Sequence, residues 1–335
     1  MSLKISLNPS RAAVFYQAER PFVPSNYPKP RVAVADNTVQ PKKLSDKAQK
    51  RIKHAINWMC YLSKKRNVRR SGGRFLSDFQ ISFVTLTLPS KQKHSHSDIK
   101  SKCLNRFLTV ARAKWGIENY VWKAELQKNG NIHFHLTTDK YIPYMAIRRE
   151  WNAAIAKLGY ITEYADKFKN MSFEEYHAFR SSRGSSDRKK NKRGFDYGNA
   201  SNWAQPNTTD VHSVKNIKNL AAYMAKYLTK ELTHENSTAA EIESAESYKG
   251  RLWYCSQSLS KLGNVVLNFN PLTSRIIRSL KRIKSVFTFA NEWVECFFFK
   301  ASQLPRQLKE ALRQQLVSHA LVKNYPFPSD IPTFA

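Results

Sequence analysis

The sequence predicts an α+β fold in which helices pack on a central antiparallel sheet. Strand-like runs rich in β-branched and aromatic residues alternate with segments in which apolar residues recur at helical spacing. Two strand-like runs, residues 120–127 and 132–139, are separated by a short turn with Asn129 and Gly130, as in antiparallel hairpins. With 41% hydrophobic residues, a chain of 335 residues has enough apolar material for one large domain with appendages or two modest domains.

The chain before this sheet is expected to be an appendage. Residues 1–43 contain six prolines and little periodicity, which predicts an extended or disordered basic arm. Residues 44–70 begin with a helix whose apolar residues recur at helical spacing and whose remaining surface is crowded with Lys and Arg. A solvated surface and a contact with a DNA backbone explain this basic helix equally well.

The other elements follow along a domain expected at residues 75–300. Its first strand is expected at residues 81–88, and residues 166–207 are polar enough to predict a long loop or insertion. A C-terminal helical extension and tail occupy residues 301–335. The remaining expected elements are helices at 97–114, 145–158, 216–231, 272–283 and 304–323, short strands at 209–214, 251–255 and 265–269, and strand-like pieces at 285–299.

The charge of the chain indicates a polyanionic partner. Lys and Arg number 56 against 25 Asp and Glu, and a net charge of +31 repels itself unless a polyanion screens it. We expect nucleic acid rather than a membrane, because no stretch approaches the roughly 20 apolar residues that span a bilayer. Six basic residues in the polar insertion are candidate DNA contacts: Arg183, Arg188, Lys189, Lys190, Lys192 and Arg193.

The cysteines and the N-terminal residues favour a cytoplasmic location. The four cysteines are far apart and form no CxxC pair, which argues against a zinc ribbon or a disulfide scaffold. The first residues lack the apolar run of a signal peptide. We therefore expect a protein of a reducing compartment.

His133 and His135 predict a metal site on the strand at residues 132–139. Side chains alternate across a strand, so the two imidazoles share one face and the intervening apolar residues share the other. A three-residue loop with Gly130 in the left-handed conformation pairs residue 127 with residue 131 and sets Glu125 opposite His133. Two imidazoles and a carboxylate suit Mg²⁺ or Mn²⁺, and imidazole also accepts Zn²⁺ or Ni²⁺. Gln127 is the weaker third ligand, and ordinary half-buried histidines are the alternative.

The predicted helix at 216–231 carries two candidate nucleophiles. Tyr223 and Tyr227 lie one helical turn apart at the edge of its apolar stripe, with Lys226 and Lys230 just beyond them. A phenol has a pKa near 10 and needs help to attack at neutral pH, which Lys226 and a nearby metal ion would supply. Tyrosines that only cap the edge of the core are the alternative.

Three motifs in this order resemble those of HUH endonucleases, specifically the two-tyrosine rolling-circle replication initiators (Rep proteins) of single-stranded DNA phages. These motifs are Thr85-Leu86-Thr87, His133-Phe134-His135 and Tyr223-x-x-Lys226-Tyr227, over about residues 75–270. Glu125 falls where such proteins often place a third metal ligand. The resemblance implies a ferredoxin- or RRM-like sheet and nicking of single-stranded or supercoiled origin DNA. It also implies a 5′-phosphotyrosine link, a free 3′-OH primer and rejoining by the second tyrosine.

The resemblance also implies partners and leaves alternatives. The chain has no GxxxxGK[ST] loop, so strand separation requires a separate host helicase, and extension requires a polymerase. A phage-encoded protein of this kind acts in the bacterial cytoplasm. An HUH transposase usually has a cysteine cluster, which is missing, and a relaxase usually has a third histidine close by, for which His212 is the candidate. A non-catalytic DNA-binding protein of the same fold is the rival outside the enzymes.

Overall fold

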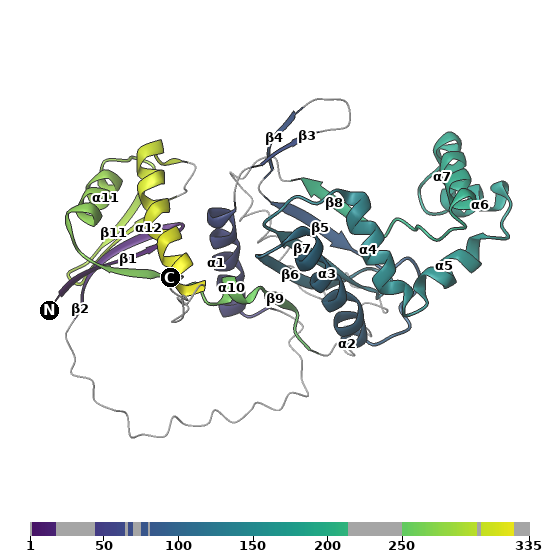
Figure 1. Cartoon of the computed structure of the whole chain (residues 1–335), viewed down its shortest axis with the longest axis horizontal. Coiled ribbons are helices and arrows are strands. Elements are labelled where there is room, and N and C mark those ends of the chain that lie inside the picture. Colours follow the sequence, from purple (N-terminus) through teal and green to yellow (C-terminus); the bar gives the residue numbers. More distant parts are fainter. Residues whose placement is uncertain are drawn as a thin grey trace, which may run out of the picture.

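The computed structural model describes residues 2–17, 44–63, 66–69, 75–79, 81–213, 250–299 and 303–324. In this part of the chain, two five-stranded antiparallel sheets lie on either side of helix α1 (Asp46–Leu62), as Figure 1 shows. The predicted α+β class and antiparallel sheet are confirmed. No described helix is long and apolar enough to cross a membrane.

The sheet nearer the middle of the sequence, which we call the central sheet, has the order β8-β5-β7-β6-β9. Strand β7 is therefore flanked on both sides, and every neighbouring pair in this sheet is antiparallel. The five strands are β5 (Ser82–Leu86), β6 (Tyr120–Leu126), β7 (Ile132–Thr138), β8 (Thr209–Ser213) and β9 (Trp253–Cys255).

Helices cover one face of the central sheet because the apolar residues of β6 and β7 point to that face. Trp151 of α4 (Tyr144–Ala156) packs against Phe134 of β7, with ring centroids 6.2 Å apart. It also meets Phe107 of α3 (Asn105–Trp115) edge-on at 6.0 Å. Gly116 ends α3 at φ 60°, a left-handed conformation that favours glycine. Before α3 lie α2 (His96–Asp98) and the π-helical turn η1 (Ile99–Leu104).

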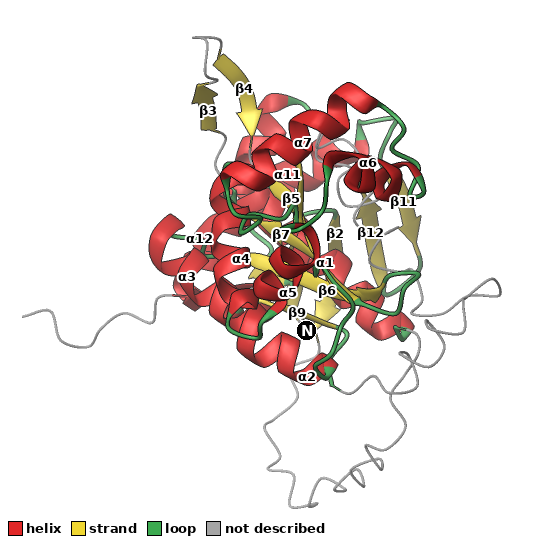
Figure 2. Ribbon diagram, turned by 90° about the vertical axis from the view of Figure 1, so that its right-hand side faces the viewer, coloured by secondary structure: helices red, strands yellow, loops and turns green. Residues whose placement is uncertain are grey.

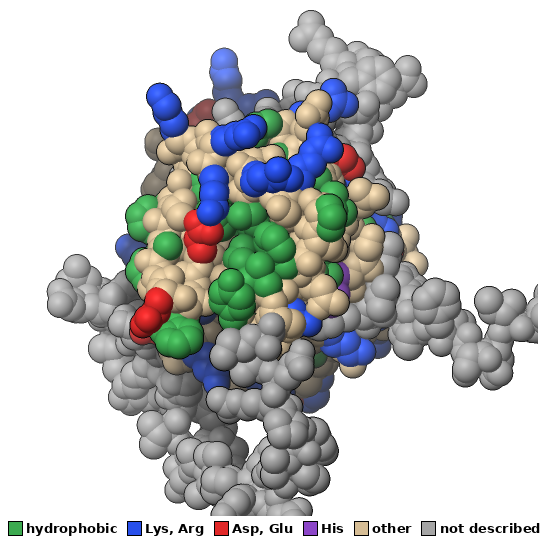
Figure 3. Space-filling model, turned by 90° about the vertical axis from the view of Figure 1, so that its left-hand side faces the viewer, with side chains coloured by type: hydrophobic (Ala, Val, Ile, Leu, Met, Phe, Trp, Pro, Cys, Tyr) green, Lys and Arg blue, Asp and Glu red, His purple; other side chains and the backbone are tan. Residues whose placement is uncertain are grey.

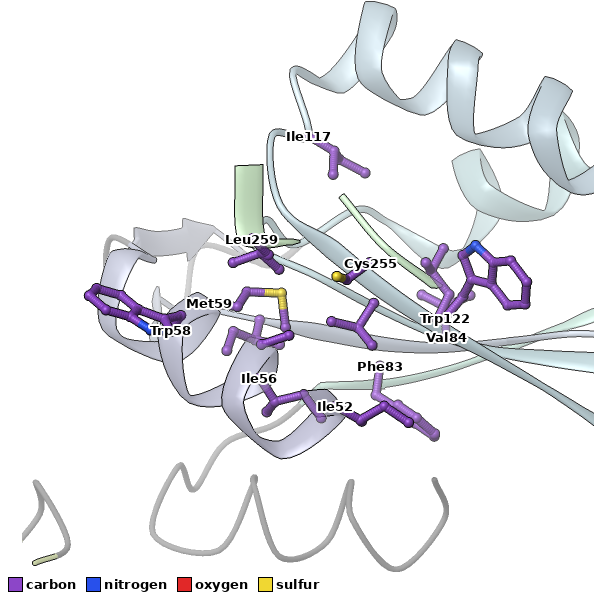
Figure 4. Packing of buried hydrophobic residues seen from close by; sticks show 14 of the residues in the cluster. Ile52, Ile56, Trp58, Met59, Phe83, Val84, Ile117, Trp122, Cys255 and Leu259 are labelled. Carbon is purple, nitrogen blue, oxygen red and sulfur yellow. The ribbon is translucent and has the colours of Figure 1, made fainter. Parts of the chain in front are cut away.

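Helix α1 covers part of the other face. Its buried residues Ile52, Ile56 and Met59 point toward the strands, close to Phe83 of β5 (Figure 4). Ser45 caps its first turn by accepting a hydrogen bond from the backbone of Ala48. The predicted basic helix is thus confirmed as an element, and its apolar stripe is part of the core. Short elements flank it: the paired strands β3 (Arg66–Arg69) and β4 (Phe75–Phe79), and helix α10 (Gln257–Ser260).

The second sheet, which we call the terminal sheet, corrects the prediction of an N-terminal arm. Residues 2–17 form two paired strands within a sheet completed by C-terminal residues, and residues 18–43 lie outside the described part. Ile5 and Leu7 are fully buried on one face of the first strand. The strands, in the order β10-β1-β2-β12-β11, are β1 (Ser2–Asn8), β2 (Arg11–Gln17), β10 (Val265–Asn268), β11 (Phe287–Ala290) and β12 (Val294–Phe298).

The terminal sheet and its helices share a core with the central sheet. Helix α11 (Pro271–Lys281) buries Ile276, Ile277 and Leu280, and helix α12 (Arg306–Asn324) buries Leu312 and Leu316. These side chains belong to one contiguous apolar cluster that also includes residues of α1 and the central sheet. The predicted C-terminal helix is confirmed, and the domain boundary expected near residue 300 does not separate two cores.

The polar segment at 166–207 is not a long loop. Together with residues just before it, the segment folds into three helices that project from the central sheet (Figures 1 and 2). They enclose a small separate core in which Phe168 stacks on Trp203 with ring centroids 5.0 Å apart. Gly198 lies under Trp203, where a β-carbon would come within 2.4 Å of the ring. We call this unit the inserted helices: α5 (Tyr160–Phe168), α6 (Phe173–Ser181) and α7 (Arg188–Ala200).

Candidate metal centre

The hairpin of β6 and β7 brings Glu125 beside both histidines. The strands pair Glu125 with His133, and the backbone N–H of Gln127 donates to the carbonyl of Asn131 at 2.8 Å. Gly130 adopts φ 79°, so the loop has the predicted left-handed glycine and the predicted length. This register is confirmed, and it sets the carboxylate and both imidazoles on one face of the central sheet.

The three side chains converge on one point. Oε2 of Glu125 lies 3.0 Å from Nε2 of His135 and 3.3 Å from Nε2 of His133. One donor atom from each of the three residues lies within 4.8 Å of the other two. Glu125 and His135 are buried, whereas the His133 side chain is 16% exposed. The open side of this triad is therefore at His133.

The spacing of these atoms fits a divalent cation. Metal bonds of about 2.1 Å at right angles hold neighbouring donor atoms about 3.0 Å apart. The two distances from Glu125 to the histidines match that value, and tetrahedral bonds of similar length separate donors only slightly more. The triad supplies three ligands, and further positions around an ion on the His133 side remain for other oxygens. Glu125, His133 and His135 thus form a candidate site for a divalent metal.

The pKa of Glu125 is held well below its usual range. Burial acts to raise this pKa, but hydrogen bonds with His133 and His135 and the positive charge of Lys123 outweigh it. The carboxylate therefore stays ionised, as a metal ligand must.

His135 is oriented by two neighbours on β5. Its Nδ1 lies 3.2 Å from Oγ1 of Thr85, and its ring stacks on Phe83 with centroids 5.3 Å apart and planes 12° from parallel. When Nε2 binds a cation, Nδ1 carries the hydrogen and donates it to Thr85. The threonine that begins the first motif therefore has a structural reason to stand there.

Lys123 is a residue of this site that the sequence did not identify. Its side chain is only 2% exposed, and Nζ lies 2.9 Å from Oε1 of Glu125. Oε1 is thus held by the lysine while Oε2 faces the imidazoles. The signal was present, because residues 123 and 125 share a face by alternation, but a lysine on a polar face ordinarily reaches solvent.

Other predicted site residues lie outside the described residues. Tyr223, Lys226, Tyr227 and Lys230 fall between residues 213 and 250, so their roles stay predictions. His212 lies on β8 with its backbone paired to that of Phe83, and its side chain is not described.

The six basic residues of the insertion lie on or next to α7, and they fall into two groups. Arg188 pairs with Glu174, and Lys192 pairs with Asp196 at 2.7 Å. Arg183 lies over the ring of Phe179 at 4.4 Å. The exposed side chains that form no ion pair with a described acidic residue are Lys189, Lys190 and Arg193.

Removal of one imidazole tests the triad directly. His133→Ala is expected to raise the Mn²⁺ dissociation constant more than about tenfold, because even partners outside the ligand set commonly contribute that much. Isothermal titration calorimetry without DNA measures it. His177→Ala, in α6, is the matched control and should bind Mn²⁺ like the unmodified protein. Equal affinity in His133→Ala would remove this histidine from the ligand set.

A second substitution tests the charge of Lys123. Lys123→Met keeps most of the buried stem and removes a positive charge close to the expected cation. At an effective dielectric constant of about 20, that change strengthens Mn²⁺ binding about tenfold or more. The same calorimetric titration checks this. Weaker binding in Lys123→Met would instead mean that the lysine acts mainly by holding the Glu125 carboxylate in place.

Comparison with known families agrees with these features. Residues 81–232 match the family model of the replication-associated protein ORF2. The matched region extends from β5 through the candidate metal triad to the predicted tyrosine helix. Neither the search of curated proteins nor that of solved structures found a match. The similarity over this region supports a replication initiator.

Proposed function

We propose that the protein initiates rolling-circle DNA replication by nicking and rejoining one strand at an origin. The observation that carries this proposal is the buried Glu125–His133–His135 triad on the flanked strand β7, within a region similar to replication-associated proteins. The donor set of two imidazoles and one carboxylate, without thiolate, favours Mn²⁺ or Mg²⁺.

Tyr223 acts as the nucleophile in this proposal. Its phenolic oxygen attacks the phosphorus of the scissile phosphodiester, the bond from phosphorus to the 3′ oxygen breaks, and the phenol proton ends on the released 3′-OH. The products are a 5′-phosphotyrosine and a free 3′ primer end. Lys226 stabilises the negative charge that develops on the phosphate oxygens, and a cation held by the triad would polarise the same phosphate.

Tyr227 performs the second transfer. Because the phosphotyrosine bond conserves the energy of the broken phosphodiester, rejoining needs no nucleotide cofactor. Tyr227 attacks a second origin phosphate, and the 3′-OH so released attacks the first phosphotyrosine and closes a circle. Unwinding and synthesis fall to a host helicase and a DNA polymerase.

Electrostatics of the triad favour assembly together with the DNA. Lys123 neutralises the charge of Glu125, so the site has little net negative charge with which to attract a cation. A DNA phosphate supplies the missing negative charge on the open side at His133. We infer that metal and scissile phosphate bind cooperatively.

Formation of a covalent protein–DNA adduct tests the enzymatic proposal. With Mn²⁺ and single-stranded or supercoiled origin DNA, the unmodified protein should form an adduct that mass spectrometry locates on Tyr223. Tyr223→Phe should abolish nicking, whereas Tyr227→Phe should nick and fail to rejoin. Undiminished nicking by Tyr223→Phe/Tyr227→Phe would exclude a tyrosine nucleophile. DNA binding without any adduct would favour the non-catalytic alternative, and a target unrelated to an origin would favour a transposase or a relaxase.

The inserted helices are proposed to hold the DNA backbone. Replacement of Lys189, Lys190 and Arg193 by Gln should weaken DNA binding at all sequences and reduce the salt dependence by about one unit of slope for each phosphate that is no longer neutralised. Fluorescence anisotropy at several salt concentrations measures both. Arg188→Gln is the matched control, since Arg188 already pairs with Glu174 and its replacement should change the slope less. An unchanged slope in the triple variant would exclude these side chains as phosphate ligands.

A further inference from the structure

The outer face of the terminal sheet carries three exposed phenylalanines side by side. Pairing of β11 with β12 sets Phe287 opposite Phe298 and Phe289 opposite Cys296, so all three rings share one face. Their exposed fractions are 68% for Phe287, 51% for Phe289 and 41% for Phe298. The rings of Phe287 and Phe298 lie 6.0 Å apart. We call Phe287, Phe289 and Phe298 the phenylalanine face.

This exposure is concentrated in one part of the molecule. On the opposite face of the same sheet, Leu7, Ala12 and Phe297 are fully buried. Figure 3 views the molecule from the end where the terminal sheet lies, with hydrophobic side chains gathered in the middle and several Lys and Arg side chains above them. Of ten exposed large hydrophobic residues in the described part, seven belong to the terminal sheet, its turns or α11: Tyr16, Val266, Leu272, Phe287, Phe289, Trp293 and Phe298. An apolar patch of this kind marks a binding surface.

Basic residues complement the aromatic ones. Arg11 of β2 is paired with Phe298 and so continues the row of Phe287 and Phe298 across the sheet. Its Nε atom is buried and has no hydrogen-bond partner among the described residues. Residues 2–17 and 265–299 together contain seven Lys and Arg, against Glu292 and Glu295 as their acidic residues, and Glu295 is neutralised by Lys281 at 2.8 Å. The face therefore suits a partner with aromatic rings and negative charge.

We propose that the phenylalanine face binds single-stranded DNA by base stacking, with Arg11 contacting the phosphates. Unpaired bases present their ring faces to aromatic side chains, whereas the bases of a duplex are already stacked on one another. Paired strands about 4.8 Å apart present rings at a spacing suited to successive stacking. This surface is separate from the metal triad, and only the choice of DNA over RNA rests on the proposed function. The strand displaced during rolling-circle synthesis is one such ligand.

A triple Phe→Leu substitution separates stacking from simple apolar contact. The variant F287L/F289L/F298L keeps an apolar surface and loses the rings. It should bind a 20-nucleotide oligo(dT) about tenfold or more weakly, since stacking of each base commonly contributes a factor of at least about 5. Fluorescence anisotropy in EDTA, which prevents cleavage, measures this. Affinity for a 20-base-pair duplex should change little. Tyr144→Leu, an equally exposed aromatic on α4, is the matched control and should leave oligo(dT) affinity unchanged.

Other occupants give different outcomes. Unchanged oligo(dT) affinity in the triple Leu variant overturns the proposal. Self-association in sedimentation that survives Phe→Leu and disappears on Phe→Ala would assign the face to a second copy of the chain. Co-sedimentation with phosphatidylglycerol vesicles that is abolished by Phe→Ala would assign it to lipid. Adduct formation on a short origin oligonucleotide should persist in the triple Leu variant, so failure of this proposal and failure of the nicking proposal are distinguishable.

Discussion

The pairing of Glu125 with His133 is the constraint on which the proposed function depends. Side chains alternate along a strand, so a slip of one residue in this hairpin would turn Glu125 to the face that packs on α4. Gly130 prevents the slip by closing the loop at φ 79°. Asn131 fixes the end of the hairpin, because its side chain donates to the carbonyl of Ser90 and accepts from the backbone of Gln92. Two short local features thus decide whether three ligands meet.

The elements that the sequence predicted well are those with a strong local period. Alternation at residues 120–138, with a glycine turn, was sufficient for the hairpin and for the position of Glu125 opposite His133. The terminal sheet was not predicted because β1 and β2 find their partners, β10 and β12, more than 250 residues away. Their alternating Ile5 and Leu7 were visible, yet a strand signal does not name its neighbour, and the six prolines of residues 1–43 suggested an arm.

The inserted helices and Lys123 were missed for different physical reasons. The inserted helices are polar on average because their core is small and consists of scattered aromatic residues such as Phe168, Tyr176 and Trp203, which no regular period connects. Lys123 was missed because lysine is rarely buried, and only the folded site reveals the carboxylate that compensates its charge. Both are interactions between residues whose types alone suggest solvent exposure.

Helix α1 makes the two sheets one mechanical unit. It packs on the central sheet through Ile52, Ile56 and Met59, and its core is continuous with that of α11, α12 and the terminal sheet. A close-packed interior transmits position rather than flexing, so a strand held on the terminal sheet would keep a fixed orientation relative to the metal triad. The chemistry of strand transfer benefits from this rigidity, because a 3′ end released by a nick must be kept close until it is extended or rejoined. A small loss of orientation costs much of the rate of such an intramolecular reaction. Two surfaces on one rigid core therefore suit a cut-and-rejoin cycle better than two domains on a mobile linker.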